Sequence, residues 1–365
     1  MLVRLLSKMN GERFSNIAIS VTDEGRLGRP LRDLGVPVHA LEMRRGTLDP
    51  AGLWRLTRLL RQERPDLVQT WLYHSDLLGL IASRLTGVPR LAWNIRCSET
   101  DERYRTGLRG VLVRILSRLS AWPDVVIANS SAGVASHRRI GYHPRRWEMI
   151  PNGIDVDCFH EDAEARIDVR RELGLDQDCI LVGLVARFDP LKDHPTFLRA
   201  AARLVQNGND VRFVLIGAGM DSQNQELTQL IDTMGLAGRV FLLGERNDIP
   251  RLDAALDIGV CSSTGEGFPN MIAETMACGV PCVTTDVGDA AELVGASGIS
   301  VPARDPDAMA AAFRELLDAG VEGRRQRGEA ARRQIAGHFD LATMVSRYEA
   351  LYTELVEVAG PATPQ

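Results

Sequence analysis

Residues 262–286 read SSTGEGFPNMIAETMACGVPCVTTD, and their order predicts the fold class of the chain. An apolar run that ends at Ser262 predicts a strand, and a glycine-rich loop around Glu266 follows it. Pro269 predicts a helix start, because proline at the first helical position forfeits no hydrogen bond. A Gly-Val-Pro segment ends that helix, and a second strand is expected from Val283. Strand, loop, helix and strand form a βαβ unit, in which ligands bind beyond the carboxyl ends of the strands.

The expected helix start suits an anion, because it offers free backbone N–H groups and the positive end of the helix dipole. Pro269, Asn270 and Met271 lie there. Glu274 lies one turn further on, on the face of Asn270. A carboxylate among small apolar neighbours needs a hydrogen-bonding partner, and a ribose diol would serve. The alternative is that Glu274 is a solvated helix residue and Glu266 an exposed loop charge.

Glu266, seven intervening residues and Glu274, within this glycine- and proline-bounded segment, resemble the signature of the retaining glycosyltransferases of family 4. The resemblance covers nearly the whole chain. It implies an α/β protein of the GT-B fold, with two doubly wound Rossmann-like domains that face each other across a cleft. Residues 1–158 would form the acceptor-side domain and residues 159–340 the nucleotide-sugar-binding domain. A last helix, residues 341–357, would pack back on the first domain.

Strand-like and helix-like segments alternate along the first half, which predicts a parallel sheet covered on both faces. The chain nevertheless opens with an amphipathic helical segment, residues 1–9, and no strand precedes it. In the resembled family a first strand and a Gly-Gly loop come before such a helix. We therefore expect this sequence to lack them, through a truncated start or a misplaced initiation codon, and expect reduced activity as a result.

Three residues that follow predicted strands in the first half are acceptor-side candidates: His74, Arg96 and Asn129. The alternative for His74 is a hydrogen-bonded loop histidine, and Asn129 with Ser130 could simply cap the next helix. The resembled family often has a His-Gly pair where this chain has Arg96, so a histidine-dependent role is not expected there. A basic stretch that includes Arg103 and Arg105 is a further candidate for acceptor or membrane contact.

In the second half, Arg187 and Lys192 flank a turn after an apolar strand, where two cations suit a diphosphate. Surface ion pairs with Asp189 and Asp193 are the alternative. The spacing is similar to the diphosphate clamp of the family, which favours the diphosphate.

Two more loops follow predicted strands of the second half. Gly217 opens a Gly-Ala-Gly loop that lacks the third glycine of a dinucleotide motif, so the dehydrogenase interpretation is disfavoured. In the family this loop lies near the nucleotide. Arg246 lies in a loop expected to border the base, and Asp248 could cap the short helix after it.

Charge is divided unevenly along the 365 residues. Residues 1–150 carry 24 Lys+Arg against 14 Asp+Glu, and residues 151–365 carry 19 against 34. A basic first domain could contact an anionic membrane or an anionic acceptor, although solvated arginines are the alternative.

Six scattered cysteines without a CxxC pair predict buried thiols in a reducing cytoplasm. No apolar run reaches the length of a membrane-spanning helix, so we expect a cytoplasmic protein that can be peripheral to the membrane.

The resemblance implies a transferase that moves a sugar, with retention, from a nucleoside-diphosphate sugar (UDP- or GDP-linked) to a lipid-linked or polysaccharide acceptor. The expected catalytic residues are Arg187, Lys192 and Glu266, and the expected donor-binding residues are Glu274, Asn270, Met271, Pro269, Gly217 and Arg246. No metal is expected, because positive groups of the protein would neutralise the leaving diphosphate. No other cofactor and no nucleic-acid partner is expected. The alternatives are a non-catalytic nucleotide-sugar-binding protein and a GT-B sugar-nucleotide epimerase.

Overall fold

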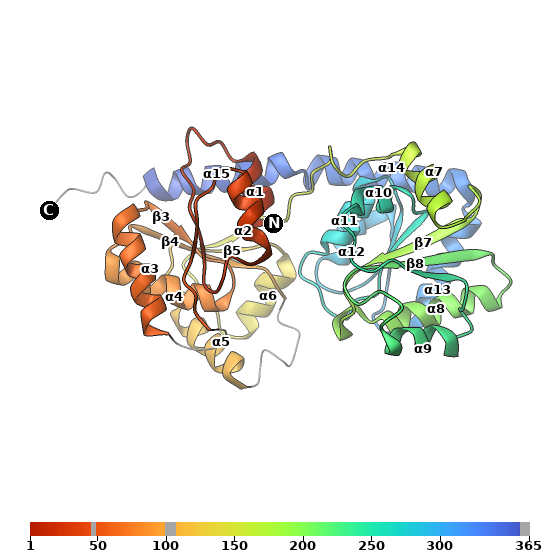
Figure 1. Ribbon diagram of the computed structural model, residues 1–365, viewed down its shortest axis with the longest axis horizontal. Coiled ribbons are helices and arrows are strands. Elements are labelled where there is room, and N and C mark those ends of the chain that lie inside the picture. Colours follow the sequence, from red (N-terminus) through yellow and green to blue (C-terminus); the bar gives the residue numbers. More distant parts are fainter. Residues whose placement is uncertain (45–48, 99–106, 358–365) are drawn as a thin grey trace. The chain divides into compact units, whose positions relative to one another are not determined.

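The computed structural model describes residues 1–44, 49–98 and 107–357 and is α/β throughout (Figure 1). Two compact units are present: Met1–Gly153 together with the last helix, α15 (Leu341–Glu357), and Ile154–Asp340. The division falls at Gly153 rather than Cys158, because Ile154 is fully buried in the second unit and its N–H donates to the carbonyl of Phe339 at 2.8 Å. Arg103 and Arg105 lie outside the described residues.

The second unit is built on a parallel six-stranded sheet with the order β12-β11-β10-β7-β8-β9. Its apolar side chains alternate between the two faces, since Phe213 and Leu215 enter one core cluster while Val214 and Ile216 enter the other. The strands are β7 (Ile180–Val185), β8 (Val211–Ile216), β9 (Val240–Leu242), β10 (Ile258–Cys261), β11 (Cys282–Thr285) and β12 (Ile299–Val301).

Helices cover both faces of this sheet, as Figure 1 shows. One face carries α8 (His194–Gln206), α9 (Gln225–Thr233) and α13 (Pro306–Asp318). The other carries α7 (Ala163–Glu172), α10 (Ile249–Ala254), α11 (Asn270–Ala277), α12 (Ala290–Val294) and α14 (Gly320–His338).

The order of strands places a topological switch point between β7 and β10. From β7 the chain adds β8 and β9 on one side, then returns to β10 on the other side of β7. The helices that follow these two central strands, α8 and α11, therefore pack on opposite faces of the sheet. Their connecting loops diverge at the carboxyl ends of β7 and β10, where an open α/β sheet binds its ligand.

The first unit contains a parallel four-stranded sheet of order β3-β4-β5-β6. One face packs on α1 and α15, and the other on α4 and α5 (Figure 1). The strands are β3 (Leu67–Gln69), β4 (Arg90–Ile95), β5 (Val125–Ala128) and β6 (Trp147–Met149). The helices of the unit are α1 (Leu2–Lys8), α2 (Gly28–Asp33), α3 (Pro50–Glu63), α4 (Tyr73–Thr86), α5 (Gly107–Leu119), α6 (Ser131–Arg139) and α15.

A separate parallel pair, β1 (Ala18–Ser20) and β2 (Val38–Ala40), completes the first unit. Ile19 of β1 and Val68 of β3 pack against the same small core cluster, yet β1 and β3 are not paired. A doubly wound sheet would have one more strand at this position. No described strand pairs with β1 or β3 there, and the residues of β1, β2 and β3 are only half-buried.

Within the described ranges, no helix combines the length and the apolar character needed to cross a membrane.

Candidate active site

The loops that follow β7 and β10 are joined to each other at the switch point of the second unit. The backbone N–H of Thr264 donates to the carbonyl of Leu191 at 2.8 Å, and the hydroxyl of Ser262 donates to the carbonyl of Lys192 at 2.6 Å. Residues Pro190–Lys192 form a 3₁₀ turn, which Asp189 caps through a bond from the N–H of Leu191. Residues that are some seventy positions apart in sequence are thus held together as one structure.

Lys192 and Glu266 form an ion pair in this structure, and both side chains are largely buried. Glu266 also accepts a hydrogen bond from the Ser263 hydroxyl at 2.7 Å. The alternative pairing of Lys192 with Asp193 is wrong, because Asp193 instead caps α8 and binds Thr196. Two of the three expected catalytic side chains are therefore in direct contact.

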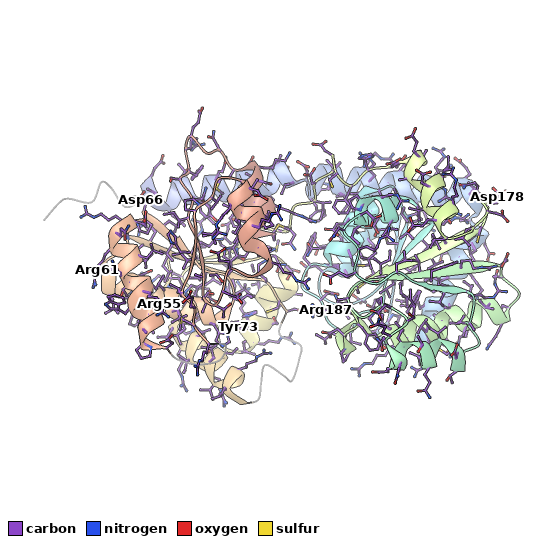
Figure 2. The ribbon with its side chains drawn as sticks, viewed as in Figure 1. Arg55, Arg61, Asp66, Tyr73, Asp178 and Arg187 are labelled. Atoms are coloured by element: carbon purple, nitrogen blue, oxygen red, sulfur yellow. The ribbon has the colours of Figure 1, made fainter. Side chains whose placement is uncertain are left out.

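Arg187 lies at the carboxyl end of β7 and is exposed (Figure 2). It pairs with Asp189 at 3.0 Å, as the surface ion-pair alternative expected. No contact within the described residues connects it to Lys192 or to α11. Its 65% exposed side chain is accessible to a ligand at the same loop.

The helix α11 begins at Asn270, so Pro269 is its N-cap and not its first helical residue. Pro269 is buried, Asn270 is exposed, and Met271 and Glu274 are half-buried. The helix therefore presents its first N–H groups beside the loop that carries Glu266, as the sequence predicted. The backbone behind Glu266 is crowded: a Cβ on Gly288, whose φ is +58°, would overlap the carbonyl of Glu266.

Asp253 is a buried carboxyl close to Glu274 that the sequence analysis did not single out. It accepts a hydrogen bond from the Thr275 hydroxyl at 3.0 Å. Burial raises the pKa of Asp253 well above its usual range, and the negative charge of Glu274 raises it further. A single aspartate in α10, a short helix that also contains Arg251, gave only a weak sequence signal for a buried acid.

Two expected donor-binding positions lie beside the same sheet edge. Gly217 follows β8 with φ of +141°, and its N–H donates to the carbonyl of Gly244 at 2.7 Å. Arg246 binds Asp248 at 2.7 Å and Glu172 at 2.9 Å, and these bonds raise the pKa of its guanidinium. Asp248 does not cap α10 through its side chain, because both of its oxygens bind arginines.

The three acceptor-side candidates lie in the first unit. His74 is exposed and belongs to α4, which begins one residue earlier than His74. Arg96 follows β4, donates to Asn152 and stacks on Trp71, with the guanidinium carbon 5.1 Å from the ring centroid. Asn129 is buried and is not a helix cap, because Ser130 caps α6 through a 3.0 Å bond from the N–H of Gly133.

A buried histidine in the first unit was also missed by the sequence analysis. His137 on α6 binds the carbonyl of Gly133 through Nδ1 at 2.7 Å and the hydroxyl of Tyr73 through Nε2 at 2.9 Å. Because the carbonyl can only accept, Nδ1 carries the proton and Nε2 accepts from Tyr73. Burial lowers the pKa of His137 to about 4, so the ring is neutral at pH 7.

Among the residues that the structure describes, no group of three or more His, Cys, Asp or Glu side chains is placed to hold a metal ion. Metal independence stays an expectation, based on the positive groups at the switch point.

The family models match both halves of the chain. "Glycosyl transferase 4-like domain" matches residues 12–153, and "Glycosyl transferases group 1" matches residues 179–319. The chain belongs to the group 1 glycosyltransferases and has the GT-B fold.

Similar proteins agree with this assignment. The chain is 28% identical over 315 residues to the UDP-Gal:alpha-D-GlcNAc-diphosphoundecaprenol alpha-1,3-galactosyltransferase of Escherichia coli, with 84% of this chain and 80% of that protein covered. It is 33% identical over 241 residues to the D-inositol 3-phosphate glycosyltransferase of Geodermatophilus obscurus, covering 61% of this chain but only half of that relative. The crystal structure of HepE of Anabaena in complex with UDP superposes with a TM-score of 0.84 at 24% identity, covering 97% and 95% of the two chains. The chain is accordingly a glycosyltransferase that uses a nucleotide sugar.

Proposed function

We propose that this glycosyltransferase transfers a hexose, with retention of anomeric configuration, from a UDP-linked sugar to a phosphate-bearing glycan or lipid-linked acceptor. The E. coli relative is named for a UDP-sugar donor and a diphosphate-linked lipid acceptor, and the Geodermatophilus relative for an inositol phosphate acceptor. These names support the choice of UDP over GDP and of an acceptor that carries phosphate.

The observation that carries the proposal is the junction of the β7 and β10 loops. Lys192 and Glu266 are paired there, beside the start of α11. As the glycosidic bond of the donor breaks, the diphosphate gains negative charge. Lys192, Arg187 and the N–H groups of α11 would stabilise that charge without a metal, because preorganised positive groups need little rearrangement.

Glu266 and Glu274 have separate roles in this proposal. Glu274 would accept hydrogen bonds from the ribose hydroxyls of the nucleotide. Glu266, which is already held by Ser263, would bind the transferred sugar and stabilise its developing positive charge. Pro269, Asn270, Met271, Gly217 and Arg246 would border the nucleotide. The donor is bound by the second unit, and the acceptor by the first.

The test is turnover of the UDP-sugar after removal of each cation. We expect Arg187→Ala and Lys192→Ala each to lower kcat by about a hundredfold, the loss typical of one preorganised charge-stabilising group. Arg199→Ala is the matched control, because Arg199 is an exposed arginine of α8 in the same unit. Wild-type turnover in both clamp variants would contradict the proposal. Incubation of the donor without acceptor would reveal epimerisation, and binding without any turnover would indicate a non-catalytic protein.

A further inference from the structure

A layer of polar side chains lies on the α15 face of the first sheet, at the carboxyl ends of β4 and β5. Ala92 of β4 and Ile127 of β5 pack in the core cluster of α15. Residues two apart on a strand share a face, so Asn94 and Arg96 continue that side of β4, and Asn129 continues that side of β5.

Tyr348 of α15 joins this layer from the helix side. Its hydroxyl accepts a 2.8 Å hydrogen bond from the amide nitrogen of Asn94, and Arg96 lies beside it. Tyr348 is fully buried, and burial raises the pKa of its phenol. The last helix thus fixes two side chains of the sheet.

Arg96 is held firmly, and the described side chains that hold it carry no opposite charge. Asn152, Trp71 and Tyr348 contact its guanidinium, and all three are uncharged. Within the described part of the chain it forms no ion pair, and its Nη1 is buried without an acceptor. Burial lowers the pKa of this guanidinium, the interaction with Tyr348 opposes that shift, and no carboxylate of the described residues contributes. A partly buried cation without compensation is costly, which is typical of a site that an anion completes.

Two amide oxygens in the same layer also lack donors. Asn94 is 0% exposed and Asn129 is 3% exposed, and the Oδ1 of each has no hydrogen-bond partner among the described residues. Buried polar groups normally have hydrogen-bond partners, so we expect hydroxyl groups of a ligand or water molecules to donate to these oxygens. Water can satisfy an amide oxygen, but only an anion compensates the guanidinium.

We propose that Arg96 binds the phosphate of a phosphorylated sugar or polyol acceptor, while Asn94 and Asn129 accept hydrogen bonds from its hydroxyls. This inference rests on the proposed function, because it assigns the acceptor group that the first unit recognises. Trp71 and Asn152 act as positioning residues that orient the guanidinium fork toward the phosphate. The chemistry of the layer matches such a ligand: one fixed cation for the anion, and two acceptors for hydroxyl donors.

The test measures phosphate binding directly. Calorimetric titration with inorganic phosphate and with glycerol 3-phosphate is compared for the wild type, Arg96→Gln, Arg118→Gln and Arg187→Ala. Arg118 is an exposed arginine of α5 in the same unit, so it controls for net charge. Arg187→Ala removes one cation of the diphosphate clamp in the other unit. We expect Arg96→Gln to weaken binding by at least about tenfold, since a charge-assisted hydrogen bond is lost. Arg118→Gln should bind as the wild type does, whereas Arg187→Ala, which belongs to the diphosphate clamp, reports any phosphate that binds there instead.

The inference would be overturned if Arg96→Gln bound phosphate as tightly as the wild type does, or if only Arg187→Ala lost phosphate binding. It would also be overturned if the wild type bound neither inorganic phosphate nor glycerol 3-phosphate. Arg96→Lys keeps the charge but loses the planar fork that stacks on Trp71, so it should bind phosphate more tightly than Arg96→Gln and less tightly than the wild type. Circular dichroism of each variant checks that the fold is retained. Failure of the transferase proposal would be seen separately, as absent sugar transfer in a protein that still binds phosphate through Arg96.

Discussion

At the scale of single residues, Lys192 and Glu266 neutralise each other before any ligand is bound. In our proposal, the diphosphate of the donor competes with Glu266 for the ammonium group of Lys192. The carboxylate therefore has two opposing effects: it weakens the attraction of Lys192 for the leaving group, and in our proposal it stabilises the sugar.

We accordingly predict opposite changes in binding and turnover for Glu266→Gln. UDP should bind several-fold more tightly, because Lys192 no longer has a carboxylate partner, while kcat should fall by about a hundredfold. Calorimetry with UDP and a transfer assay measure the two effects. Glu226→Gln, at an exposed position of α9, serves as the control. Weaker UDP binding in Glu266→Gln would show that the carboxylate supports the nucleotide rather than competing with it.

At the scale of elements, the loops after β7 and β8 depend on a close backbone approach. A Cβ on Gly217 would overlap the carbonyl of Ala186, and its φ of +141° is a conformation that other residues rarely adopt. Gly208 also has a positive φ, +85°, but nothing lies within 4 Å of a Cβ there. Alanine substitutions at the two glycines therefore differ in their effects: both introduce backbone strain, but only Gly217→Ala also introduces a steric overlap.

We predict that Gly217→Ala lowers the free energy of unfolding by about 3 kcal/mol or more, and Gly208→Ala by about 1 kcal/mol. Denaturant unfolding of both variants measures the difference. Equal losses would mean that the loop after β7 moves aside to accommodate a methyl group.

The sequence predicted the long elements of both units well, because their periodic apolar residues and flanking glycines and prolines are local signals. The last helix, expected over residues 341–357, is observed as Leu341–Glu357. Short or highly charged elements were missed. Trp147–Met149 has no apolar run, and the helix Ala163–Glu172 carries charges around most of its surface. Burial of these elements depends on distant neighbours, which local composition does not encode.

The candidate site was predictable only as far as its loops. The turn chemistry located Arg187, Lys192, Glu266 and the start of α11, because each follows a strand. The pairing of Lys192 with Glu266, and of Asn94 with Tyr348, joins residues 74 and 254 positions apart, and no local pattern reports such distances. The exact start of α11 was also not predictable. A proline such as Pro269 indicates that a helix begins nearby, but the sequence does not show whether it is the N-cap or the first helical residue.

At the scale of the whole molecule, each unit contains one buried neutral histidine. Burial lowers the pKa values of His137 and His194 to about 4. Below pH 6.5 the unfolded chain takes up protons on these residues that the folded chain does not, so acid weakens both units. Asp76 and Asp253 act in the opposite direction, because burial raises their pKa values and the folded chain retains their protons.

A comparison with His137→Gln isolates the contribution of one histidine, because Gln can keep bonds to Tyr73 and Gly133 while the carboxyl contributions cancel. We predict that the stability of the wild type relative to this variant falls by about 3 kcal/mol between pH 7.5 and pH 4, from a pKa of 6.5 in the unfolded chain and about 4 in the folded one. Denaturant unfolding across this range measures it. A constant difference would place a charged imidazole in the folded protein.

The break between the β1–β2 pair and the four-stranded sheet has a consequence for association with other chains. A continuous open sheet leaves backbone donors and acceptors unsatisfied by strands only along its two outermost members. Here β1 and β3 each have one edge with which no described strand pairs. An extended peptide that paired with either edge would add a strand to that sheet, so these edges are places for strand exchange and self-assembly.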